Sequence, residues 1–436
     1  MSAFDIGLWS FAVLLLLIFL RAPIGLAMFL CGLVGTYLIL GGWTVPLARL
    51  KTEVYTQFSS YSLSIVPLFI LMGQFASLSG MSTRLFRAGE AWLGHKKGGV
   101  AMAAIGACAG FGSICGSSLA TAATMGKTAL PELRRYGYDG GFSTATLAAG
   151  GTLGILIPPS VILVIYAILT EQNIAKLFLA AFVPGILAAI GYMLTVAIYV
   201  RLYPERAGVR DKQPIRERIR SLIDVWPVMA IFLIVVGGIY SGIFSPTDGA
   251  SVGAAAMFFL ALRSGEMTWP VFKKAVIETA KSTAMIFFIV VGAAMYNGFL
   301  ALTHVPQDLA SWIGGQGFHP MLVLWIILLF YLVFGCLMDS LSMILLTIPI
   351  FFPIIAELDF GMSAEHVAIW FGILALIVVE VGLITPPVGM NLFIINAMER
   401  QTPIYETYKA VLFFVASDLL RVVLLVSFPA ITLFLL

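Results

Sequence analysis

Four long stretches without Asp, Glu, Lys or Arg constrain the fold of this chain more than any other feature. They cover residues 98–126, 140–170, 225–247 and 309–338, and the shortest is 23 residues long. A helix of about 20 residues crosses the hydrocarbon core of a bilayer, so each stretch is long enough to span it. The apolar blocks are solid, whereas strands of a membrane barrel alternate between apolar and polar residues. The sequence therefore predicts an all-α polytopic membrane protein.

The composition agrees with this prediction. Of the 436 residues, 60% are hydrophobic and 11% are charged, whereas soluble domains carry about a quarter charged residues. Shorter apolar stretches bring the expected number of segments to about thirteen, not all of which need to cross the bilayer completely. Asp5 is the first charged residue, and no basic residue precedes the first apolar stretch. A secretory signal would start with basic residues, so we expect a retained first helix whose N-terminus lies in the periplasm.

Basic residues predict the topology. The segments 84–97, 127–135 and 201–220 hold 14 of the 25 Lys and Arg residues, and short basic loops face the cytoplasm. Segments 303–320 and 357–366 have no Lys or Arg and are expected outside. The segment 201–220 could also contact lipid or nucleic acid, but its interleaved acids favour a cytoplasmic loop that sets topology. A net charge of only +3 argues against nucleic-acid binding.

Cysteine and histidine residues show no metal-binding pattern. Cys31, Cys108, Cys115 and Cys336 all lie in apolar segments, and no paired Cys or His spacing accompanies them. We expect buried packing residues and no metal or haem cofactor.

An internal repeat is the most informative pattern. Residues 154–159 and 382–387 share the motif G-x-x-x-P-P at an offset of 228, and residues 112–117 resemble residues 335–340 at an offset of 223. Two motifs in the same order indicate a duplicated half. We place the halves at 62–200 and 282–436, with scaffold helices at 1–61 and 221–281, in a single transport unit covering 1–436.

Each tandem proline must interrupt its helix. Two consecutive prolines remove two backbone donors and force the preceding residue out of the helical conformation. Irregular backbone in a membrane is tolerated only where it is buried in protein or lines a hydrated site. A pair of simple proline kinks is the alternative, but two breaks at matching places of two halves are typical of the centre of a secondary transporter.

The residues around the interruptions suit ions. Hydroxyl oxygens and exposed carbonyls at a helix break offer hard ligands for Na⁺, and helix N-termini suit a carboxylate. Packing between helices is the alternative role for small hydroxyl residues. Asp339 lies on the repeated motif, and an acid within the membrane is a functional candidate. Glu380 either neutralises a cation or bonds a broken helix. Asp418 and Arg421 are three residues apart and suit a structural ion pair.

An ordered set of motifs extends over the whole chain. They are RAPIGLAM, GSICGSS, LPELRRYGYD, GGTLGILIPPS, GIFSPTDGASVGA and EVGLITPPVGMNLF. Together they resemble the large membrane subunit of TRAP (tripartite ATP-independent periplasmic) transporters, the DctM-like family that includes C4-dicarboxylate and sialic acid systems. The segment that contains Asp248 departs from the usual form, which has Glu there, so a role of this acid is less certain. Its sequence also suits a tightly packed helix start.

This resemblance implies an elevator-type transporter with internal inverted repeats, two re-entrant hairpins and two broken helices. The hairpin tips would be GSICGSS and GCLMDS, and the breaks LIPPS and ITPPVG. Such proteins use inward Na⁺ flow to take up an organic anion, a carboxylate or sugar acid, across the bacterial inner membrane. A periplasmic substrate-binding protein delivers the anion, and a small four-helix membrane subunit completes the complex. Na⁺ is the coupling ion, and we expect no other cofactor and no enzymatic activity.

Candidate site residues follow from the motifs and the resemblance. One Na⁺ site would use Ser113, Gly116, Pro158 and Pro159, and the other Gly335, Asp339, Thr385 and Pro386. The candidates for substrate contact are Ser117, Ser160, Ser340 and Asn391. Glu380 is a possible coupling acid.

Other functions remain open at this point. One is a stand-alone Na⁺/H⁺ or citrate-type transporter that needs no binding protein. Another is an intramembrane aspartyl protease, although Asp339 lacks the G-x-G-D context of that class. A passive channel agrees less well with two broken-helix motifs.

Overall fold

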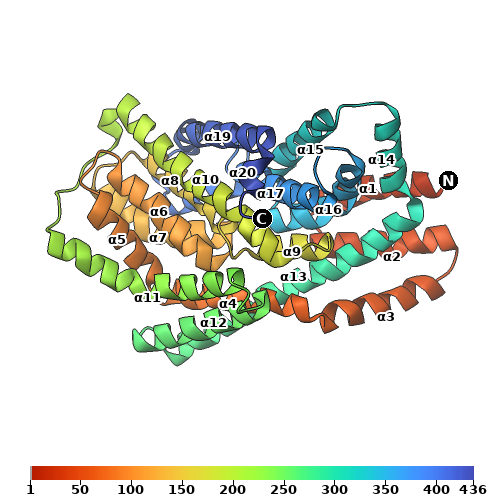
Figure 1. The fold of residues 1–436 in the computed structure, drawn as a ribbon, viewed down its shortest axis with the longest axis horizontal. Helices are drawn as coiled ribbons and strands as arrows, with labels where there is room; N and C mark the ends of the chain where they lie inside the picture. The colour runs from red at the N-terminus through yellow and green to blue at the C-terminus, as the bar shows by residue number, and fades with distance from the viewer. Residues whose placement is uncertain (1) are drawn as a thin grey trace.

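The computed structural model describes residues 2–436, and these residues form α-helices, two short 3₁₀ turns and no β-strand (Figure 1). Within them, seven helices are long and apolar enough to cross a membrane, or eight if one bent pair counts as a single span. Four further apolar helices are shorter, at 10 to 17 residues. The predicted all-α polytopic membrane fold is confirmed.

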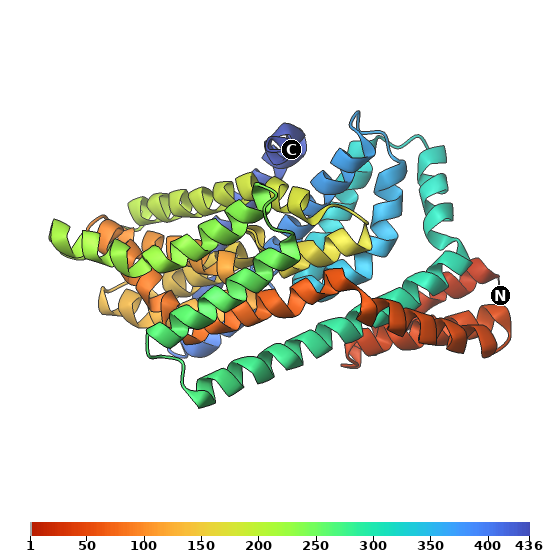
Figure 2. The ribbon, with the colours of Figure 1, turned by 60° about the horizontal axis from the view of Figure 1, so that its bottom comes forward.

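The N-terminal helices pack against one very long helix. α1 (Ala3–Phe19), α2 (Ile24–Leu40) and α3 (Thr44–Ser59) lie along α13 (Trp269–Thr303), which has 35 residues (Figures 1 and 2). Small residues let α2 and α13 approach closely, because a Cβ added to Gly292 would lie 2.3 Å from the carbonyl oxygen of Gly25. Arg49 ties α3 to α13 by donating a hydrogen bond to the carbonyl oxygen of Gly298, at 2.9 Å.

A second group of helices packs around α4 (Ile65–Leu78), which follows the 3₁₀ turn Tyr61–Ser64. α4 packs against α12 (Pro246–Arg263) and α13, while α5 (Met81–Leu93) packs against α11 (Ile215–Tyr240). α12 begins with a capping box in which Ser245 and Asp248 bond each other's backbone N–H groups. The helix-start interpretation of this segment is therefore confirmed.

The basic segment 201–220 is only partly a loop. α10 (Ile174–Leu202) ends in it, a 3₁₀ turn covers Pro204–Arg206, and α11 already begins at Ile215. Two arginines dock the segment onto α5 and the loop after it: Arg210 pairs with Glu90 at 2.9 Å, and Arg218 lies 3.2 Å from Nδ1 of His95. Partial burial and the nearby charge of Arg218 lower the pKa of His95, which favours a neutral ring that accepts this hydrogen bond.

Each half of the chain contains a helical hairpin followed by a broken helix. The first hairpin joins α6 (Gly99–Cys115) to α7 (Ser118–Arg135), and the break separates α8 (Gly140–Leu156) from α9 (Val161–Leu169) with a bend of 45°. In the second half, the hairpin is α15 (Pro320–Gly335) with α16 (Ser340–Glu357), after the short α14 (Val305–Gly315). α17 (Ala364–Gly382) and α18 (Met390–Met398) form the second broken helix.

None of the four charge-free stretches forms one continuous helix. Residues 98–126 turn back at a hairpin tip, residues 140–170 are broken, and residues 309–338 are divided between α14 and α15. Residues 225–247 contain the end of α11, a turn and the start of α12. Lack of charge signals apolar surroundings, and a buried turn satisfies that condition as well as a straight span does.

The C-terminal helices complete the interior. α19 (Ile404–Ser427) packs against α8 and α10 and is followed by α20 (Pro429–Leu433). Arg421 lies 2.8 Å from Asp418, and both are buried, which confirms the expected ion pair. The hydroxyl of Tyr192 also donates to Asp418, at 2.7 Å. All four cysteines are free and buried, as expected.

Candidate functional site

Each hairpin tip supplies a side chain that caps the helix after it. In the first, Gly116 ends α6 with a φ of +63°, which glycine adopts at little cost, and Ser117 caps α7 by accepting from Ala120 N at 3.4 Å. In the second, Asp339 caps α16 by accepting from Ser342 N at 3.0 Å and from the Ser342 hydroxyl at 2.5 Å. Asp339 therefore has a clear structural role, and its proposed role in Na⁺ binding stays a prediction.

Each hairpin meets its own broken helix through a pair of glycines. A Cβ added to Gly112 would lie 2.4 Å from the Cα of Gly154, and a Cβ added to Gly382 would lie 2.6 Å from the carbonyl carbon of Gly335. Real side-chain carbons do not approach this closely, so both contacts require glycine. The four glycines are the same ones that the two repeated motifs pair along the sequence. The two halves of the chain thus have the same glycine-to-glycine contact between hairpin and broken helix.

The helix breaks lie beside the hairpin tips. Ser160 caps α9 by accepting from Leu163 N at 3.4 Å, and a Cβ on Gly116 would lie 3.2 Å from the carbonyl oxygen of Pro159. At the other break, Gly389 N donates to the carbonyl oxygen of Cys336 at 3.3 Å. The Pro158–Pro159 and Pro386–Pro387 bonds are both cis. Free backbone carbonyls at such breaks are available as oxygen ligands.

Glu380 joins the two halves at their centre. It is fully buried on α17, and its two carboxylate oxygens accept hydrogen bonds from Ser118 and from Ser340, the latter at 2.5 Å. These serines are the first residues of α7 and α16, so one carboxylate holds both hairpin tips. Of the two roles left open for Glu380, the structure shows a bonding role, in which the carboxylate holds the hairpin tips rather than the broken helix itself. A role in coupling stays a prediction.

A cavity of about 220 Å³ lies between the two tips. Gly116, Ser117, Asp339 and Ser340 line it, so the structure brings together four of the predicted site residues. The rest of its wall comes from α4, α9, α13 and the end of α8. Two helix N-termini, those of α7 and α16, open into one space, and a helix N-terminus carries unpaired N–H groups and a partial positive charge.

Other predicted residues lie outside the cavity wall. The hydroxyl of Ser113 donates to the carbonyl oxygen of Gly110 at 2.9 Å, and the hydroxyl of Thr385 donates to the carbonyl oxygen of Val381 at 2.7 Å. The Asn391 amide donates to the carbonyl oxygen of Ala148 at 3.2 Å and so connects α18 to α8. Ser160 is fully buried at its cap position. Their roles in ion or substrate binding stay predictions.

Sequence reasoning missed three polar residues of the cavity wall. Ser118 is one of the small hydroxyl residues for which helix packing is the alternative role; it lines the cavity and also bonds Glu380. Gln74 on α4 and Ser282 on α13 also line the cavity. Gln74 is the one amide in a helix whose other polar side chain is Ser77, and this isolated amide is a signal in the sequence. Ser282 has no distinguishing local pattern.

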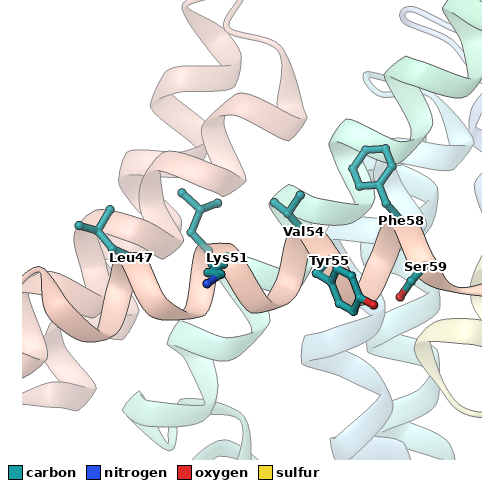
Figure 3. Close-up of a pocket in the computed structure, with 7 residues that line it drawn as sticks. Leu47, Lys51, Val54, Tyr55, Phe58 and Ser59 are labelled. Atoms are coloured by element: carbon teal, nitrogen blue, oxygen red, sulfur yellow. The ribbon is translucent and has the colours of Figure 1, made fainter.

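A surface hollow on α3 is a different kind of feature. It measures about 670 Å³ and is lined by Leu47, Leu50, Lys51, Val54, Tyr55, Phe58 and Ser59 (Figure 3). All seven residues belong to α3 or its last turn, so the hollow is the outer face of one helix. It lacks the converging polar groups that a solute site needs.

Two hairpins whose tips meet at one cavity, each packed against its own broken helix, are typical of a secondary transporter of the membrane. The chain belongs more specifically to the family described as "Tripartite ATP-independent periplasmic transporter, DctM component", which matches residues 11–431. It is therefore a large permease subunit of a TRAP transporter and a multi-pass membrane protein.

Curated relatives agree with this family. The chain is 35% identical over 403 residues to the C4-dicarboxylate TRAP transporter large permease protein DctM of Pseudomonas aeruginosa, covering 92% of each chain. It is 29% identical over 420 residues to the sialic acid TRAP transporter large permease protein SiaM of Vibrio cholerae, covering 96% of each. The relatives are permeases, which agrees with the expectation of a transporter rather than an enzyme.

A solved structure shares the fold. The YdaH transporter of Alcanivorax borkumensis matches with a TM-score of 0.61 and 16% sequence identity, over 89% of each chain. At this identity the likeness concerns the arrangement of helices and carries no information on substrate.

Proposed function

We propose that this permease takes up an organic carboxylate across the bacterial inner membrane by coupling its movement to inward Na⁺ flow. One observation carries the proposal: the N-termini of two 18-residue helices, α7 and α16, open into the same cavity. Their first N–H groups, at Ser118, Leu119, Ser340 and Leu341, have no partner within the helix. Together they provide positive potential for a carboxylate without a basic side chain.

The oxygen groups next to this cavity suit Na⁺. On the first side these are the Ser113 hydroxyl and the carbonyls near Pro159, beside Gly116. On the second side they are the Thr385 hydroxyl, the carbonyls around Gly335 and Pro386, and the Asp339 carboxylate. Within the described residues no group of three or more His, Cys, Asp or Glu side chains could hold a transition metal. Hydroxyl and carbonyl oxygens are hard donors, which an alkali cation accepts.

We further propose an elevator movement. The two hairpins and two broken helices form the mobile unit, because Glu380 and the two glycine contacts hold them together as one body. The helices α1 to α3 and α11 to α13 form the scaffold against which this unit slides. The re-entrant character of the hairpins and the inverted orientation of the halves belong to this proposal.

The substrate is an organic anion such as a C4-dicarboxylate, sialic acid or another sugar acid, in keeping with the names of the relatives. Two partners complete the system: a small four-helix membrane subunit and a periplasmic substrate-binding protein that delivers the anion. These partners follow from the tripartite family rather than from a feature of this chain.

Uptake into proteoliposomes tests the proposal. The complex is reconstituted with the small subunit, and loaded binding protein is added outside under an inward Na⁺ gradient. We expect uptake that stops when K⁺ replaces Na⁺ and that requires both partners. Uptake that persists without a Na⁺ gradient would refute the coupling. Transport without any binding protein would favour the stand-alone ion transporter instead.

A further inference from the structure

The polar groups of the cavity come from two separate sources. One source is the pair of hairpin tips, with Ser117, Ser118, Asp339 and Ser340 and two helix N-termini. The other is the wall formed by α4 and α13, where Gln74 and Ser282 are the polar side chains among apolar neighbours. Ser118, Ser340 and Asp339 already have hydrogen-bond partners within the protein. In the described chain neither Gln74 nor Ser282 has one, so both are available to a solute.

The two sources differ in charge. The two helix N-termini supply about half a positive charge each. The Asp339 carboxylate caps one of them, and the Na⁺ proposed at the tips and breaks supplies the further positive charge that a bound carboxylate needs. The α4 and α13 wall carries no charged residue, and none of the described residues lining the cavity is Lys, Arg or His. Lys281 precedes Ser282 but lies outside the lining, is mostly exposed and pairs with Glu278 at 3.0 Å. The proposed Na⁺ ligands all lie at the tips and breaks and add nothing to this wall.

Asp339 belongs to the hairpin tips and not to the α4 and α13 wall. It is the one Asp or Glu among the described lining residues, and its carboxylate accepts from Ser342 alone. A second carboxylate on a bound substrate would lose water and meet no cation on the α4 and α13 wall. Burial of a charge without a partner is costly.

We propose that Gln74 and Ser282 bind the uncharged end of the substrate, so that the cavity selects an organic monoanion with neutral hydrogen-bonding groups over a dianion of equal length. The inference rests on the proposed function, because it assumes that the carboxylate lies at the hairpin tips. The Gln74 amide and the Ser282 hydroxyl each donate and accept. A substrate hydroxyl or amide satisfies both functions, whereas a carboxylate only accepts.

Matched anions test this selectivity. Purified permease in detergent with NaCl is titrated with two pairs, succinamate against succinate and gluconate against glucarate, and binding is read from thermal stability. Within each pair the length is equal and the far end differs in charge. We expect the monoanion to bind at least about tenfold more tightly than the dianion, since a loss of about 1.4 kcal/mol already corresponds to that ratio.

Variants of Gln74 make the test specific. Gln74→Leu should weaken the monoanion about tenfold and leave the weak dianion binding unchanged, because only the monoanion uses the amide. Gln74→Lys should reverse the preference, since it places a cation at the far wall. Gln316→Lys is the matched control: it adds the same charge at an exposed position outside the cavity and should not alter the ranking. If Gln74→Lys does not fold, Ser282→Lys makes the same test from α13.

The outcomes separate the inference from the function on which it rests. Wild-type protein that binds the dianions as tightly as the monoanions would overturn the inference and leave the anion site intact. The inference is also overturned if Gln74→Lys or Ser282→Lys leaves the order of the anion affinities unchanged. If none of the four anions binds, the anion site itself is wrong, and the proposed function fails together with the inference.

Discussion

Removal of the Glu380 carboxylate should loosen the centre of this permease. In Glu380→Ala, the hydroxyls of Ser118 and Ser340 both lose their buried acceptor. A buried hydroxyl that loses its partner costs about 1 to 3 kcal/mol, so the two hydroxyls together amount to about 2 to 6 kcal/mol. The lost bonds connect the two hairpin tips, so we expect Glu380→Ala to lower both the free energy of unfolding and the rate of transport.

The measurement is denaturant unfolding of the purified protein in detergent, followed by circular dichroism. Glu365→Ala is a matched control, because Glu365 forms an exposed ion pair with Lys176 at 2.6 Å. Such pairs contribute about 0 to 1 kcal/mol. Glu380→Ala should thus lower the free energy of unfolding several times more than the control.

A double-mutant cycle assigns the loss to the proposed bond. Ser118→Ala should cost about 1 to 3 kcal/mol in the wild-type protein, because it leaves a carboxylate oxygen unpaired. In the Glu380→Ala background the same change should cost almost nothing, since the acceptor is already gone. An equal cost in both backgrounds would refute the reasoning, because the two residues would then act independently.

Three further predictions follow from other contacts. Gly112→Ala and Gly382→Ala should each lower the free energy of unfolding by about 1 to 3 kcal/mol through overpacking. Gly237→Ala, with no atom within 4 Å of its added Cβ, should raise it by up to about 1 kcal/mol. Equal effects of the three changes in unfolding experiments would contradict the tight contacts. Asp418→Asn should lower the free energy of unfolding by about 3 to 5 kcal/mol in the same assay, because it deprives a buried arginine of its countercharge. An unchanged free energy of unfolding would contradict a buried ion pair at this position. Asp339→Asn should preserve stability, since Asn caps helices as well as Asp, while it raises the Na⁺ concentration for half-maximal uptake; unchanged Na⁺ dependence would exclude Asp339 from the ion site.

Local chemistry made much of the architecture predictable. Tandem prolines exclude a continuous helix wherever they occur, so both breaks follow from residues 158–159 and 386–387 alone. The repeated glycines lie at the contacts between hairpins and broken helices. A close approach of two backbones requires glycine, and the same requirement in both halves appears in the sequence as a repeat. The tip residues Ser117 and Asp339 were found for the same reason, since helix caps and turns depend on a few adjacent residues.

Tertiary structure decided what these parts do together. A charge-free stretch is compatible with a span or with a buried hairpin, and for residues 98–126 the charge pattern alone does not distinguish them, whereas the packing does. The partners of Glu380 are 262 and 40 residues away along the chain, a pairing that no local pattern predicts. Gln74 and Ser282 belong to helices outside both motifs, and they reach the cavity only because α4 and α13 pack beside the tips. The sequence by itself thus determined a membrane chain with two broken, repeated halves, whereas the composition of its binding cavity was decided by contacts between distant helices.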